Sequence, residues 1–235
     1  GSEPRIVGSP GEPRPAPYDN DLRASRGCLL EAGGQVEDAL GRGAFPILTA
    51  SDCSICMTTL PAVVRHRPDA HVLWLDAHGD FNTPETTPSG FLGGMCLAAA
   101  CGVWDAGLGA DPVVDPARVV MCGVRDLDEG ERALVERHDV DVEHPGALAG
   151  RLRGMPLYVH LDLDVLDPSV FPAQFPAPGG LSDGGLRALL AEVAAGADLI
   201  GLEVTAFQAP DDEATTGGLA ELVTSVIEPV LAPLA

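Results

Sequence analysis

Acidic residues gather directly after three short apolar runs, and their types could do metal-assisted chemistry. The residues are Asp76, His78 and Asp80 after the first run, Asp162 and Asp164 after the second, and Glu203 at the end of the third. If these carboxylates converge, they repel one another and raise one another's pKa values unless cations neutralise them. Carboxylates together with an imidazole suit Mn²⁺, Zn²⁺ or Fe²⁺. Two such ions would generate a hydroxide nucleophile near neutral pH.

Short apolar runs alternate with segments of helical periodicity along most of the chain. The predicted strands are 46–49, 71–75, 118–122, 157–161 and 199–203, with a further short candidate at 5–7. The predicted helices are 21–42, 54–66, 93–101, 129–138, 182–195 and 217–231. This alternation predicts an α/β fold with a parallel sheet covered on both faces. Because sites in such sheets lie beyond the carboxyl ends of the strands, the fold would bring the acidic residues together.

The composition excludes several classes of protein. The chain has 235 residues, 46% of them hydrophobic, which predicts a folded single domain over 1–235 with a loop-rich segment at 1–20. Its 14 basic residues, all Arg, face 35 acidic ones, and the net charge of −21 argues against nucleic-acid and membrane partners. No signal peptide or long apolar run stands out, and the six cysteines form no disulfide framework, so a cytoplasmic location is expected.

The motifs around the acidic residues resemble those of the arginase/agmatinase (ureohydrolase) family. The matching blocks are DAHGDFNTP at 76–84, SGFLGGM at 89–95, GVRD at 123–126, HLDLDVLDP at 160–168, PGGLS at 178–182 and EV at 203–204. The resemblance runs from about residue 46 to the C-terminus. It implies a three-layer α/β/α fold with a mostly parallel sheet, and a centre of two Mn²⁺ per chain.

The resemblance also implies a set of metal ligands. They are Cys53, Asp76, His78, Asp80, Asp162 and Asp164. Asp76 and Asp162 would each bridge both ions, and Asp164 could carry a proton toward the leaving amine. His160 is expected to be buried beside this centre.

Further residues match the family's substrate contacts, so a small guanidino amino acid is the expected partner. Glu203 would pair with the guanidinium nitrogens as a planar, bidentate acceptor. Asn82 and Ser89 would hold the substrate carboxylate, while Asp128 and Glu131 would hold the α-amino group. The last two could equally cap a helix N-terminus.

The chain departs from the family pattern at two places. Cys53 stands where a ligand His belongs, so it either ligates as a thiolate or is an inert buried thiol. Phe91 and Gly93 stand where arginases have Asn and a His that handles protons or substrate. Both departures resemble a branch of the family, from antibiotic biosynthesis, that cleaves Nω-hydroxy-L-arginine to hydroxyurea and L-ornithine. An N-hydroxyguanidine is less basic than a guanidine, which would suit a site lacking that His.

Several alternatives stay open at this point. The chain could be an ordinary arginase, an agmatinase or another guanidino-acid hydrolase, with a formiminoglutamate hydrolase as a more distant option. It could also be a degenerate relative that binds a ligand without turnover. The native metal and the oligomeric state, a homo-oligomer included, are not fixed by the sequence.

Overall fold

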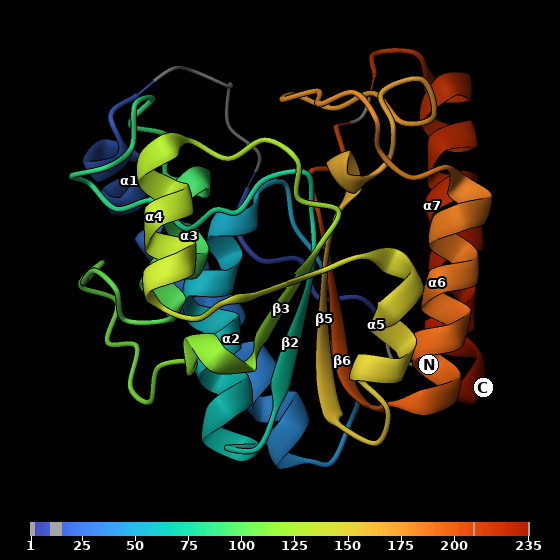
Figure 1. Ribbon diagram of the computed structural model, residues 1–235, viewed down its shortest axis with the longest axis horizontal. Coiled ribbons are helices and arrows are strands. Elements are labelled where there is room, and N and C mark those ends of the chain that lie inside the picture. Colours follow the sequence, from blue (N-terminus) through green and yellow to red (C-terminus); the bar gives the residue numbers. More distant parts are fainter. Residues whose placement is uncertain (1–2, 10–15, 209, 235) are drawn as a thin grey trace.

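A single six-stranded sheet forms the centre of the molecule (Figure 1). The computed structural model describes residues 3–9, 16–208 and 210–234. The strands are β1 (Ile47–Thr49), β2 (His71–Leu75), β3 (Val119–Cys122), β4 (Asp141–Glu143), β5 (Pro156–Asp162) and β6 (Asp198–Thr205). They lie in the order β1-β6-β5-β2-β3-β4, and every neighbouring pair is parallel. The expectation of a parallel sheet is confirmed.

Helices cover both faces of this sheet (Figure 1). They are α1 (Tyr18–Gly41), α2 (Cys56–His66), α3 (Cys96–Ala100), α4 (Glu129–Arg137), α5 (Pro145–Arg151), α6 (Asp183–Gly196) and α7 (Glu213–Leu231). The first four share one buried apolar cluster with the sheet, and the last three share the other. The predicted three-layer α/β/α architecture is therefore confirmed, and it explains why the central strands are apolar throughout rather than alternating.

Strand register sets which residues reach the carboxyl edge of the sheet. β5 pairs with β6 so that Asp162 lies opposite Thr205 and His160 lies opposite Glu203. β2 ends at Leu75, opposite Leu161, so Asp76 begins the loop at that same edge. Because β1, β6, β5 and β2 are consecutive in the sheet, the loops that follow them converge on one place.

Some sequence-based expectations differ from the structure. Residues 5–7 form no strand, and residues 1–2 and 10–15 of the expected loop-rich segment lie outside the described residues. The sequence analysis missed β4 and α5, which are short and have weak apolar patterns. Within the described residues, no helix is both long enough and apolar enough to cross a bilayer.

Candidate metal centre

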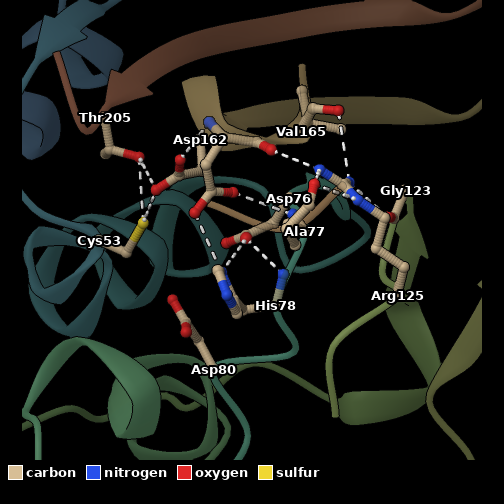
Figure 2. A network of polar contacts seen from close by, with 12 residues as sticks. Cys53, Asp76, Ala77, His78, Asp80, Gly123, Arg125, Asp162, Val165 and Thr205 are labelled. Carbon is tan, nitrogen blue, oxygen red and sulfur yellow. Dashed lines mark hydrogen bonds and ion pairs between the residues drawn. The ribbon is translucent and has the colours of Figure 1, made fainter. Parts of the chain in front are cut away.

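A cluster of acidic and soft donors lines a cavity at the carboxyl edge of the sheet (Figure 2). The cavity has an empty volume of about 400 Å³, solvent at its mouth included. Its lining includes all six expected ligands: Cys53, Asp76, His78, Asp80, Asp162 and Asp164. They come from the end of β5 and from the segments that follow β1, β2 and β5, which the sheet order brings together.

The donors lie close enough to share ions. Cys53 Sγ is 2.8 Å from Asp162 Oδ2, and His78 Nδ1 is 3.0 Å from Asp164 Oδ2 and 3.5 Å from Asp76 Oδ1. Asp76, His78 and Asp164 each offer a ligand atom within 4.8 Å of the others, and Asp76 does the same with Cys53. Asp76 therefore lies between two sets of donors, as expected of a bridging ligand.

Backbone hydrogen bonds hold the carboxylates in place. Asp76 Oδ1 accepts from the His78 amide at 2.7 Å, and Asp162 Oδ1 accepts from the Asp164 amide at 2.7 Å. These are local turns of the kind that Asp favours directly after a strand. Asp164 Oδ1 accepts from the Ala77 amide at 3.0 Å, which ties the two loops together.

Asp80 adopts a backbone conformation that is uncommon for a residue other than glycine. Its φ is +50°, and its carbonyl accepts from the amides of Leu97 and Ala98 at 3.0 and 3.3 Å. Cys96 Sγ lies 3.6 Å from its carboxylate. Strained residues of this kind persist only where their surroundings hold them, and they concentrate at functional sites.

Arg125 fixes the loop that carries Asp164. Its guanidinium donates to the carbonyls of Asp164 and Ala177 at 2.8 and 2.7 Å. It also donates to the Gly123 carbonyl at 3.0 Å (Figure 2). A rigid five-donor fork suits several backbone acceptors at once. The GVRD motif thus acts through loop position, because Arg125 does not line the cavity.

Burial and repulsion between neighbouring carboxylates raise the pKa values of several groups in the cluster. Burial, with Asp80 and Asp162 nearby, raises the pKa of Asp76 well above its usual range, and burial also raises that of Asp80. Burial and the charge of Asp164 raise the pKa of Asp162 to about 6. Burial and the surrounding carboxylates raise the pKa of the Cys53 thiol. Bound divalent cations would reverse these shifts, because they favour the ionised forms.

The residues present fit divalent metal ions. Asp76 Oδ2 is buried and has no hydrogen-bond partner among the described residues, although a lone buried carboxylate oxygen is costly. Its neighbours are carboxylates, an imidazole and a thiol, all of which are metal ligands. A cation in this position would give Asp76 the partner that the protein does not supply.

Glu203 lies behind the cavity rather than in its lining, and its expected role as guanidinium partner stays a prediction. Its side chain is fully buried and does not line the cavity. Its oxygens bind Thr59 Oγ1 at 2.7 Å, Tyr158 Oη at 3.1 Å and His160 Nδ1 at 2.6 Å. The physical reason is strand length, since β6 continues to Thr205 and leaves Glu203 two residues, about 7 Å, behind the sheet edge.

The residues expected at the amino-acid end lie outside the cavity lining. Asn82 Nδ2 donates to Asp128 Oδ2 at 3.2 Å, so these two are brought together. Ser89 is exposed, and its hydroxyl accepts from the amide of Phe91, which does line the cavity. Glu131 is buried, and its two oxygens accept from the amides of Phe81 and Asp128, so it caps the start of α4, and its expected substrate contact stays a prediction.

The sequence analysis missed other residues in the cavity lining or in contact with it. Thr205 Oγ1 lies 3.1 Å from Cys53 Sγ and 3.3 Å from Asp162 Oδ2, at the end of β6. Phe175 lines the cavity and packs against Phe91 with ring centroids 5.0 Å apart. Ala206 also lines it, with a φ of +62°. A longer estimate of β6 would have identified Thr205 and Ala206, whereas nothing in the local sequence marks Phe175.

The fold and the donor set define a parallel α/β protein with a carboxylate-rich candidate metal site at the carboxyl ends of its strands. The model of the arginase family matches residues 16–228, and the chain belongs to this family. It is 38% identical, over 93% of its length and 81% of the relative's, to the N(omega)-hydroxy-L-arginine amidinohydrolase of Streptomyces lavendulae. It is 39% identical to the arginase of Bacillus caldovelox, over 69% of this chain and 60% of that one.

Solved structures give the same result for the fold. The arginase structure from Bacillus caldovelox superposes with a TM-score of 0.80 at 28% identity, covering 94% of this chain and 82% of that one. The arginase structure from Bacillus cereus gives a TM-score of 0.79 at 30% identity, covering 88% and 78%.

Proposed function

We propose that this protein is a dinuclear-metal amidinohydrolase that cleaves Nω-hydroxy-L-arginine to hydroxyurea and L-ornithine. The observation that carries the substrate choice is that Glu203, the expected guanidinium partner, does not line the cavity. Apart from the six expected ligands, the described residues that line the cavity are Ser51, Asp52, Phe91, Gly93, Gln174, Phe175 and Ala206. Glu203, the expected guanidinium partner, already binds three protein groups.

A neutral substrate fits this arrangement better than a cation does. Arginine keeps its guanidinium charged near pH 7, and burying that charge beside apolar walls is costly. An N-hydroxyguanidine is less basic, so its neutral form is accessible and needs no carboxylate partner. The name of the Streptomyces lavendulae relative, which shares 38% identity, supports the same substrate.

The cluster would hold two Mn²⁺ ions, one near Cys53 and one near His78, with Asp76 and Asp162 between them. Ions bound there would supply a hydroxide near neutral pH and polarise the group under attack. Asp164, held by His78 and the Ala77 amide, is positioned to pass a proton toward the leaving nitrogen. Asn82, Ser89 and Asp128 would meet the amino-acid end of the substrate.

Product analysis tests this proposal. Protein loaded with Mn²⁺ is given Nω-hydroxy-L-arginine or L-arginine, and ornithine, hydroxyurea and urea are measured. We expect strong preference for the hydroxylated substrate, and a loss of turnover of at least about 100-fold in Asp164→Asn, as for removal of a general acid. The matched control is Asp183→Asn, an exposed carboxylate at the start of α6.

Other outcomes would favour the alternatives. Equal or better turnover of L-arginine would make the protein an ordinary arginase. Bound metal without turnover of either compound would indicate another guanidino substrate. A protein that retains no metal would refute the hydrolase and favour a ligand-binding relative.

A further inference from the structure

His160 on β5 has an unpartnered ring nitrogen beside the donor cluster. The side chain is fully buried, and one of its ring nitrogens lies within 4.8 Å of Cys53 Sγ and of an Asp76 carboxylate oxygen. Nδ1 is 2.6 Å from Glu203 Oε1. Nε2 has no hydrogen-bond partner in the described part of the chain. A buried imidazole normally satisfies both nitrogens, so the free nitrogen needs an explanation.

The surroundings of His160 fix its ring. The imidazole stacks on the Trp74 indole with centroids 3.5 Å apart and planes 3° from parallel. Glu203 is held in turn, because Thr59 and Tyr158 donate hydroxyl hydrogen bonds to its Oε2 at 2.7 and 3.1 Å. A carboxylate on Nδ1 favours the tautomer in which Nδ1 carries the proton and Nε2 keeps a lone pair.

This is the arrangement that metal-binding histidines adopt. Such a histidine donates its other ring N–H to a carboxylate, which orients the ring and makes the free nitrogen a better ligand. A core histidine that bound no metal would leave Nε2 unsatisfied in a fully buried place, which is costly. Glu203 does not line the cavity, and in this arrangement it orients His160 instead of contacting the substrate.

We propose that His160 is a ligand, through Nε2, of the ion that Cys53 and Asp76 hold, and that Glu203 is its positioning residue. The inference rests on the proposed metal centre and extends its ligand set. Cys53 stands where the resemblance expects a ligand histidine. His160 supplies an imidazole to the same ion from β5. Thiolate and imidazole together favour softer ions, so this position should bind Zn²⁺ or Co²⁺ more tightly than the position at His78.

X-ray absorption and metal titration test this assignment. The unaltered protein is loaded with two equivalents of Co²⁺, and its absorption fine structure is compared with that of His160→Gln. We expect a sulfur ligand in both proteins, and an imidazole contribution that falls in the variant. Chelator competition should show the Cys53-side ion bound at least about 10-fold more weakly in His160→Gln, and more weakly also in Glu203→Gln, as for loss of a supporting carboxylate.

His71→Gln is the matched control. His71 begins the neighbouring strand β2, and its Nδ1 also lacks a partner among the described residues. It belongs to neither group of donors, however, so its loss should leave both affinities unchanged. Glu203→Gln keeps the shape of the side chain and tests the assignment if His160→Gln fails to fold.

The assignment of His160 as a ligand can fail while the proposed function stands. If the unaltered protein binds two ions but its absorption spectrum contains a single imidazole, His160 is not a ligand and the proposed hydrolase stands. Unchanged affinity in both His160→Gln and Glu203→Gln would overturn the inference in the same way. If the unaltered protein binds no ion, the proposed function fails, and the inference fails with it.

Discussion

Removing divalent cations should make this protein less stable as the pH rises from 4.5 to 7. Asp162 carries the clearest effect, because burial and Asp164 raise its pKa from 3.8 to about 6. A shift of about two units corresponds to about 3 kcal/mol of folding free energy, of which about 2 kcal/mol is lost between pH 4.5 and 7. Asp76 and Asp80 change in the same direction.

The sign follows from which protonation state the fold prefers. A group whose folded pKa is raised stabilises the fold below its unfolded pKa, and that stability is lost as the pH rises through the folded pKa. For Asp162 the window therefore runs from about pH 4 to above pH 6. His78, whose pKa nearby Asp164 and Asp76 raise to about 11 against the opposing effect of burial, adds a further decline above its unfolded value of 6.5.

Urea unfolding of chelator-treated protein at pH 4.5, 5.5 and 7 measures this loss. Asp162→Asn is the control, and its stability should fall by about 2 kcal/mol less over the same range, since it cannot ionise. Added Mn²⁺ should remove much of the decline, because it binds the ionised carboxylates of the folded state. A metal-free protein whose stability is flat or rises over this range, or an Asp162→Asn slope equal to that of the parent, would refute the reasoning.

Three substitutions test other contacts. Arg125→Lys loses the fork that binds several carbonyls and should cost about 3 kcal/mol in chemical denaturation. Thr59→Val leaves Glu203 Oε2 one donor short in a fully buried place and should lower the unfolding free energy by about 1–2 kcal/mol. Gly93→Ala places a Cβ 2.4 Å from Phe91 Cε1, so the ring must turn, and turnover should fall more than thermal stability does.

The layers of the fold could be predicted from the sequence because the signal is strong there. Strands such as 71–75 are apolar at almost every position, and the helices between them keep a clear period. The short strand β4, DVE, and the helix α5, PGALAGR, have little apolar pattern of their own. Tertiary context decides both, through the edge pairing with β3 and through the burial of Leu148.

The donor cluster could be predicted for a simpler reason: each donor lies at the end of a strand or in the loop that follows it, and parallel strands end at one edge. Glu203 shows where that logic fails. The predicted strand ends at 203, but β6 continues for two more residues, and the register places Glu203 opposite His160. A two-residue error moves a carboxylate from the cavity into the core.

The register of β6 affects both the substrate side of the cavity and the metal ligands. With Thr205 and Ala206 at the end of β6, the cavity offers a guanidinium no carboxylate on that strand, which favours a substrate of lower basicity. The same register brings Glu203 against His160 Nδ1, and His160 Nε2 has no hydrogen-bond partner among the residues that the structure describes. The position of Glu203 inside β6 would therefore remove a contact to the substrate and orient His160 as a metal ligand. Ala206→Glu should raise affinity for L-arginine without changing the number of ions bound, because Ala206 lines the cavity but belongs to neither donor group.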